Sequence, residues 1–259
     1  PIKSREPWGY AIPYALSAKY YLHRTYAEYL IGKQRLKIKD IQRILAKVDP
    51  SEAETFNEDY IEKLYLEYMN VSYDDEKDIN ELINIISNYK DILILAPGGS
   101  IKHNNNKITS EIDASTCVIA VNFIPEEEEL KPDLVFLTNT KRYDAIKKKI
   151  NEVGLIITSN LLRDVKEYTY SIAYNELVYF NGKYCDDSTL MLLNLLRKIG
   201  VTKVKLAGFD GRQNGKLNFV DSRLASNKTE WMRNNQIKEI LDKVFNDLDK
   251  VFITESQYQ

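Results

Sequence analysis

Small and polar residues follow several apolar runs of this chain, and their types suit the binding of an anionic or hydroxyl-bearing ligand. Glycine after a strand lets backbone N–H groups approach an anion without a Cβ in the way. Asparagine offers an amide to a base or a ribose, and aspartate offers a carboxylate to sugar hydroxyls. The candidate ligand-binding residues are Gly98, Gly99, Ser100, Asn122, Thr138, Asn139, Asp187, Ser188 and Asp210.

The glycine turn "APGGSIKH" (96–103) follows an apolar run and has two interpretations. Its backbone N–H groups could hold a phosphate, or the two glycines could only bend the chain. The spacing matches neither GxGxxG nor GxxxxGK[ST], the two established phosphate-binding fingerprints. Both interpretations therefore stay open.

The other candidates also have a structural and a ligand-binding interpretation. Asn122 could turn the chain or offer its amide to a nucleobase or ribose. Asp210, in "GFDG", could bind a sugar hydroxyl or accept backbone N–H bonds in a turn. Asp187 and Ser188 are expected to cap the helix that follows, although its N-terminus would also attract an anion. General acid–base chemistry would fall to Asp210, Asp187 or a tyrosine.

Short continuous apolar runs alternate with helical patterns from about residue 78 onward. Continuous runs indicate strands that are covered on both faces, which with crossover helices predicts a doubly wound, mostly parallel, Rossmann-like α/β sheet. We expect strands at 91–96, 117–121, 134–138, 155–158, 176–180, 203–208 and 250–254. We expect helices at 79–89, 187–200 and 228–245. Because ligands bind beyond the carboxyl ends of parallel strands, the candidates should meet at that edge.

The first part of the chain shows helical spacing instead. Apolar residues recur every three to four positions from about residue 11 to residue 69, so we expect a helical segment at 1–77 and the α/β domain at 78–259. The acidic stretch 73–78 could be a linker or the start of the next helix. The helical segment should present an apolar, tyrosine-rich surface that could form a homo-oligomer.

Composition argues against several classes of partner. Lys and Arg total 36 against 38 Asp and Glu, a net charge of −2, so no excess field draws the chain to nucleic acid or to an anionic membrane. Without a membrane-length apolar run or a signal peptide, we expect a cytoplasmic protein in which Cys117 and Cys185 are reduced thiols. His23 and His103 have no partners at metal-ligand spacing, which predicts no metal site.

The stretch "PWGYAIPYALSAKYYLHRTYAEYLIGKQRLKIKDIQRILAKV" (7–48) resembles the helices that follow the TIM barrel in HMG-CoA-lyase-like aldolases, including 4-hydroxy-2-oxovalerate aldolases. Some of these proteins carry a further C-terminal domain, matched here by "LAPGGSI", "VNFIP" and "ITESQY". The resemblance implies an assembly domain whose partner is its own N-terminal barrel. The divalent metal and the lyase chemistry would belong to that barrel, and this chain alone would hold no cofactor. Since the chain begins at Pro1, we expect a piece of a longer protein, although removal of Met before Pro would leave the same start.

The second half also resembles sialyltransferase-like and motility-accessory glycosyltransferase-like domains. The matching residues are Gly98, Gly99, Ser100, Asn122 and Asp210. In those enzymes the glycine turn and the asparagine contact the nucleotide of a nucleotide-sugar donor, and no residue here is matched to the histidine base of the sialyltransferases. Two hypotheses follow: a nucleotide- or nucleotide-sugar-binding domain of an aldolase-like protein, or a nucleotide-sugar-dependent glycosyltransferase.

Overall fold

The computed structural model of this protein describes the α/β part of the chain. The described residues are 75–138, 140–150, 153–162, 165–177, 179–180, 184–185, 187–212, 219–220 and 231–259. The expectations for the helical segment, including its oligomer-forming surface and His23, lie outside these residues, as does Asn139.

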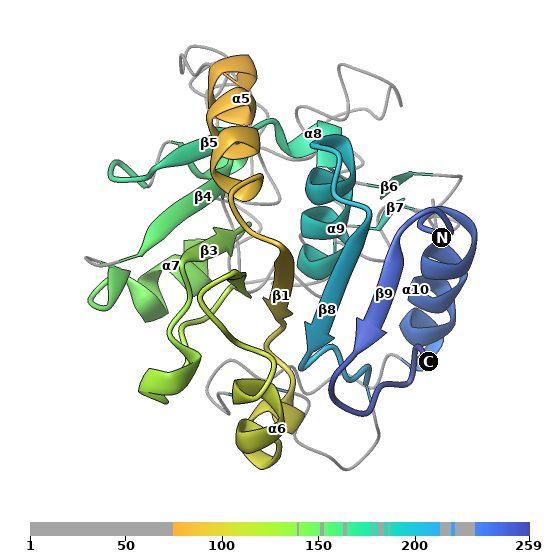
Figure 1. The fold of residues 1–259 in the computed structure, drawn as a ribbon. Coiled ribbons are helices and arrows are strands. Elements are labelled where there is room, and N and C mark those ends of the chain that lie inside the picture. Colours follow the sequence, from red (N-terminus) through yellow and green to blue (C-terminus); the bar gives the residue numbers. More distant parts are fainter. Residues whose placement is uncertain are drawn as a thin grey trace, which may run out of the picture.

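The main sheet has seven strands, all parallel, in the order β5-β4-β3-β2-β1-β8-β9 (Figure 1). Their bounds are β1 (Asp91–Leu95), β2 (Thr116–Val121), β3 (Leu134–Leu137), β4 (Gly154–Thr158), β5 (Tyr170–Ile172), β8 (Lys203–Ala207) and β9 (Asp249–Phe252). This sheet confirms the predicted doubly wound, Rossmann-like α/β fold.

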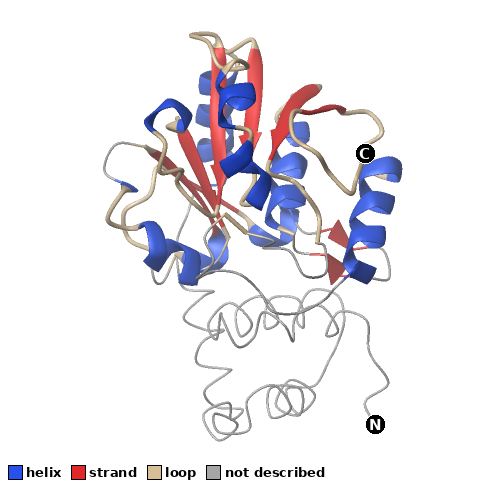
Figure 2. Ribbon diagram, turned by 90° about the horizontal axis from the view of Figure 1, so that it is seen from below, coloured by secondary structure: helices blue, strands red, loops and turns tan. Residues whose placement is uncertain are grey.

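Helices lie on both sides of the strands (Figure 2). The α-helices are α5 (Asp75–Ile86), α6 (Asn105–Thr109), α7 (Thr140–Ile146), α8 (Tyr174–Leu177), α9 (Ser188–Lys198) and α10 (Trp231–Lys243). Short 3-10 helices are η3 (Gly99–His103), η4 (Glu128–Leu130) and η6 (Ser159–Leu161). Because α5 begins at Asp75, most of the acidic stretch 73–78 is the start of this helix.

Successive residues of each inner strand enter two different hydrophobic cores. On β1, Ile92 and Ile94 pack in the core that α5, α9 and α10 cover, whereas Leu93 and Leu95 pack in the core beneath η3, α6 and α7. All six residues of β2 are buried. A sheet with both faces covered needs apolar residues at every strand position, which explains the continuous apolar runs of the sequence.

The predicted strand at 176–180 is correct only in part, and two strands, β5 and β7, were not predicted. Residues 176–177 of the expected strand lie in the short helix α8, and 179–180 (β6) pair antiparallel with 184–185 (β7) outside the main sheet. A short apolar run fits a helix turn and a strand equally well, so periodicity could not separate them. One edge strand of the main sheet is instead β5, whose three residues are too few to give a sequence signal.

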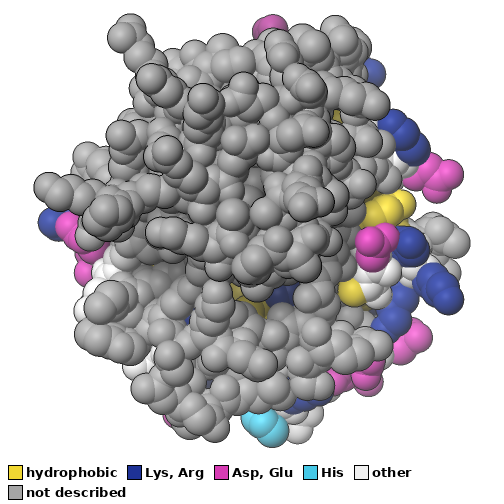
Figure 3. Space-filling model, turned by 180° about the vertical axis from the view of Figure 1, so that it is seen from behind, with side chains coloured by type: hydrophobic (Ala, Val, Ile, Leu, Met, Phe, Trp, Pro, Cys, Tyr) yellow, Lys and Arg dark blue, Asp and Glu magenta, His cyan; other side chains and the backbone are white. Residues whose placement is uncertain are grey.

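Charge is mixed on the surface of the described residues. On the face drawn in Figure 3, basic and acidic side chains lie interspersed along the margin, in keeping with the near balance of charges in the sequence. None of the helices in the described part of the chain is long and apolar enough to span a bilayer. Cys117 is a buried free thiol.

Candidate functional site at the carboxyl edge of the sheet

The strand order places a switch point between β1 and β8. From β1 the chain continues through β2 to β5 on one side, and then returns to form β8 and β9 on the other side. In open α/β sheets the crevice at such a reversal is where ligands bind. The glycine turn follows β1 and the "GFDG" loop (208–211) follows β8, so these two predicted segments flank the switch point.

Ser100 and Asp210 join the two segments across the switch point. The Ser100 N–H donates to Asp210 Oδ2 at 2.8 Å, and Ser100 Oγ donates to Asp210 Oδ1 at 2.5 Å. The glycine turn therefore does hold an anion through its backbone, but that anion is a carboxylate of the same chain. We call Ser100 and Asp210 the Asp210 pair.

Two glycines make the close approach of these loops possible. A Cβ on Gly98 would lie 2.2 Å from Gly208 O and 2.6 Å from Asp210 Cγ, and the Gly98 N–H donates to Gly208 O at 2.9 Å. Gly208 has a φ of 73°, and a Cβ there would lie 2.1 Å from Ala96 O. Gly98 thus has a packing role. The Gly99 N–H makes no hydrogen bond to the residues that the structure describes, so it is the amide that this turn can still offer to a ligand.

Burial and hydrogen bonding act on Asp210 in opposite directions. Burial raises the pKa of the Asp210 carboxyl, and the two hydrogen bonds from Ser100 lower it, with a net upward shift. A raised pKa brings a carboxyl closer to the range in which it can exchange a proton at physiological pH.

The tail after β9 (residues 253–259) holds the "GFDG" loop in place. Gln257 N–H donates to the Asp210 carbonyl at 2.9 Å, and Ser256 Oγ donates to the Phe209 carbonyl at 2.5 Å. The centroids of the Tyr258 and Phe209 rings lie 4.6 Å apart. Sequence reasoning noted this ending only as a resemblance, and its contacts with a loop about fifty residues earlier in the chain carry no local signal.

Asn122 and Thr138, which follow β2 and β3, meet at the carboxyl edge as the shared strand edge predicted, and Ser188 of α9 joins them. Asn122 Nδ2 donates to Ser188 Oγ at 2.7 Å, and its Oδ1 accepts from the Thr138 N–H at 3.1 Å. The Thr138 and Ser188 hydroxyls also share a hydrogen bond of 2.7 Å. We call these three residues the Asn122 cluster; it ties β2, β3 and α9 together.

Asn122 also turns the chain. Its φ of 61° lies in the left-handed region, which asparagine adopts more readily than most residues. Asn122 is only 7% exposed and Thr138 only 2% exposed. The turning interpretation therefore holds, and the amide keeps a second N–H on Nδ2 that the bond to Ser188 does not use.

Asp187 caps α9, as expected. Its Oδ1 accepts from the N–H groups of Thr189 at 3.0 Å and Leu190 at 3.3 Å. The N-terminus of this helix therefore already carries a carboxylate, which disfavours a second anion at that point. The contribution of Asp187 to a ligand site is indirect, through the position of Ser188.

Arg142 is a cation at this edge that sequence reasoning missed. It lies in the first turn of α7, directly after β3, and its guanidinium lies 5.0 Å from the centroid of the Phe219 ring. The adjacent Val220 N–H donates to the Pro97 carbonyl at 2.9 Å, so residues 219–220 cross the end of β1 beside the glycine turn. An arginine in the first turn after a strand was the sequence signal that could have found it.

No metal site forms in the described part of the chain. It contains no group of three His, Cys, Asp or Glu residues that could hold a metal ion, and His103 is exposed at the end of η3. The edge has hydroxyls, amides, a carboxyl with a raised pKa and the Arg142 guanidinium. These groups suit a ligand that carries both hydroxyls and an anionic group.

The chain matches no protein-family model, and no curated protein is significantly similar to it. Any function inferred for this edge of the sheet is therefore based on its geometry.

Proposed function

We propose that the carboxyl edge of the sheet binds a nucleotide or a nucleotide sugar. The observation that carries the proposal is the hydrogen-bonded junction of Ser100 with Asp210 across the switch point, with the Asn122 cluster at the end of β2, the strand next to β1. Two polar groups of different chemistry on adjacent strand ends suit a ligand with a sugar and a base.

Each part of the site has a role in this proposal. The Asp210 carboxylate accepts from ribose or sugar hydroxyls, because two carboxylate oxygens have lone pairs beyond those that Ser100 uses. The second N–H of Asn122 Nδ2 donates to the base. The Gly99 N–H and the Arg142 guanidinium, near the end of β1, contact the phosphate.

In the wider protein, we propose that this domain is an assembly and binding module attached to an aldolase-like barrel. The barrel would bring the divalent metal and the lyase chemistry, and residues 75–259 would bring the nucleotide site. A transferase is the second candidate, and the raised pKa of Asp210 favours it, because such a carboxyl can take a proton from an acceptor hydroxyl. Release of free nucleotide from a nucleotide sugar, only when an acceptor sugar is present, would separate transfer from binding.

Ligand binding to the folded chain tests the proposal. The full chain is screened by thermal shift and calorimetry against CMP, UDP, GDP and their sugar conjugates, with inorganic phosphate for comparison. A ligand whose free concentration is about 100 times its Kd stabilises the folded state by about 2.7 kcal/mol, which produces a readily measured rise in Tm. Gly99→Val and Asp210→Asn should each weaken binding about tenfold or more.

Asp113→Asn is the matched control for Asp210→Asn. Like Asp210, Asp113 accepts from both the N–H and the hydroxyl of one serine, here Ser115 at 2.8 Å and 2.7 Å, although both bonds go to Oδ1. It lies just before β2, at the opposite edge of the sheet. This variant should bind like the wild type. Absence of any Tm rise with all nucleotides and nucleotide sugars, or equal weakening by both substitutions, would overturn the proposal.

A further inference from the structure

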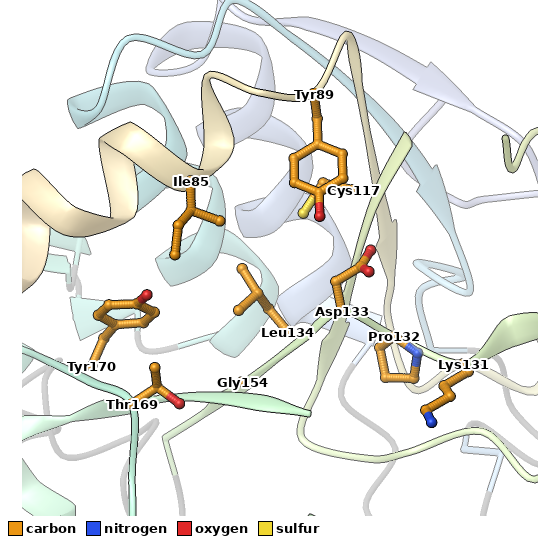
Figure 4. Close-up of a pocket in the computed structure, with 10 residues that line it drawn as sticks. All are labelled: Ile85, Tyr89, Cys117, Lys131, Pro132, Asp133, Leu134, Gly154, Thr169 and Tyr170. Atoms are coloured by element: carbon orange, nitrogen blue, oxygen red, sulfur yellow. The ribbon is translucent and has the colours of Figure 1, made fainter. Parts of the chain in front are cut away.

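A pocket opens at the opposite edge of the sheet from the proposed nucleotide site. It has a volume of about 460 Å³, and its lining includes Cys117, Leu134, Gly154 and Tyr170, which lie at or next to the amino ends of β2, β3, β4 and β5 (Figure 4). The nucleotide site lies at the carboxyl ends of the same sheet. The two are therefore separate sites, and neither depends on the other.

The walls of this pocket are largely apolar and aromatic. Ile85 of α5 and Leu134 of β3 line it together with Tyr89 and Tyr170 (Figure 4). A Cβ on Gly154 would lie 2.6 Å from Leu134 Cδ2, so a glycine at this position leaves room for the Leu134 side chain in the pocket wall. A volume in the range of small-molecule sites, with walls of this kind, suits a compact apolar ligand.

A carboxylate stands beside these walls. Asp133 Oδ2 accepts from the Val118 N–H at 2.8 Å, and its Oδ1 accepts no hydrogen bond from the described residues. Figure 4 shows the Asp133 carboxylate and the Tyr89 hydroxyl pointing toward one another. One oxygen thus secures β2 to the start of β3, while the other remains able to accept from a ligand.

The negative charge of Asp133 shifts the pKa values of two other residues that line the pocket. The Asp133 carboxylate, with a smaller effect of burial, raises the pKa of Tyr89. Burial, with a smaller effect of Asp133, raises the pKa of Cys117 to about 12. Lys131 is the basic residue of the lining, and Figure 4 shows its side chain directed away from the Asp133 carboxylate. A negative potential among apolar walls disfavours anions and favours cations.

We propose that this pocket binds a small amine that carries an apolar group. The ammonium donates to Asp133 Oδ1, and the apolar body lies among Ile85, Leu134 and the two tyrosines. Tyrosine suits both ends of such a ligand, because its ring packs on apolar groups and its face attracts a cation.

The test uses the full chain with 2-phenylethylamine as the probe, followed by thermal shift and calorimetry. The neutral analogue 2-phenylethanol and the anion phenylacetate are matched comparisons of similar size. The amine should raise Tm and bind about tenfold or more tightly than the alcohol, since a charge-assisted hydrogen bond is stronger than a neutral one. Phenylacetate should not bind.

Asp133→Asn removes the charge and keeps an acceptor for Val118 N–H, and it should weaken amine binding about tenfold while the alcohol is unaffected. Asp113→Asn, also at the amino edge but outside the pocket lining, should leave amine binding unchanged. If Asp133→Asn does not fold, wild-type binding at rising NaCl gives a second measurement, because salt should weaken the amine and not the alcohol. Equal affinity for amine and alcohol, or no Tm rise with the amine, would overturn the proposal.

Discussion

At the scale of single residues, the raised pKa of Asp210 makes a prediction about how stability depends on pH. Its pKa is raised by burial in the folded protein, so the folded state holds this proton more tightly than the unfolded state does. Wild-type stability relative to Asp210→Asn should therefore fall as pH rises from the ordinary value of 3.8 through the raised native pKa. Urea unfolding of both proteins across this window measures the difference.

For Asp113→Asn we expect a pH dependence of stability with the opposite sign. Hydrogen bonds from Ser115, with a smaller one from Thr116, lower the pKa of Asp113, so wild-type stability relative to this variant should rise as pH rises through the lowered pKa toward 3.8. A pH-independent difference between wild type and Asp210→Asn would contradict the assigned burial of that carboxyl.

Gly98 permits a second prediction at this scale. In Gly98→Ala the new Cβ would lie 2.2 Å from a backbone oxygen that cannot move freely, so we expect a loss of about 3 kcal/mol or more in the free energy of unfolding. Gly200→Ala is the comparison, because its φ of 89° is strained for alanine but nothing lies within 4 Å of the new atom. The latter should cost about 1–2 kcal/mol. Equal losses in urea unfolding would show that the loops at the switch point separate easily.

At the scale of elements, α9 links the core that it covers together with α5 and α10 to the proposed site. Its buried residues pack against the sheet, and Ser188 in its first turn contacts β2 and β3 through the Asn122 cluster. Asp187→Ala removes the cap and should cost about 1 kcal/mol in urea unfolding, whereas Asp187→Asn, which retains a capping oxygen, should cost little. If Ser188 is a ligand-site residue held by this cap, Asp187→Ala should also weaken nucleotide binding at a temperature where the protein stays folded. A loss of stability without a loss of binding would limit Asp187 to the helix.

At the scale of the whole molecule, two hydrophobic cores lie in the described α/β part. Their buried members run from Leu82 to Tyr258, and each lies on one side of the same sheet. We therefore expect residues 75–259, expressed alone, to unfold in a single cooperative urea transition with near-UV circular dichroism like that of the full chain. A gradual transition with strong dye binding would indicate that residues 1–74 complete a core.

The sequence alone determined the fold class and much of the carboxyl edge. Six of the seven expected strand segments correspond to β1, β2, β3, β4, β8 and β9, because burial on both faces imposes apolar residues at every position. The cap at Asp187 was predictable because it is a contact between neighbours in the chain. The meeting of Asn122 with Thr138 followed from a topological rule that places parallel strand ends at one edge, whereas the bond of Ser188 to both was not predicted.

Only the tertiary structure decided which groups bond to which. Ser100 and Asp210 are 110 residues apart, so no local pattern shows that a carboxylate of the chain itself occupies the Ser100 amide. The strand order that makes a switch point between β1 and β8, the edge strand β5, and the amino-edge pocket also depend on such distant contacts. Local propensity and periodicity act over a few residues, whereas these features arise from the packing free energy of the complete sheet, which local sequence does not encode.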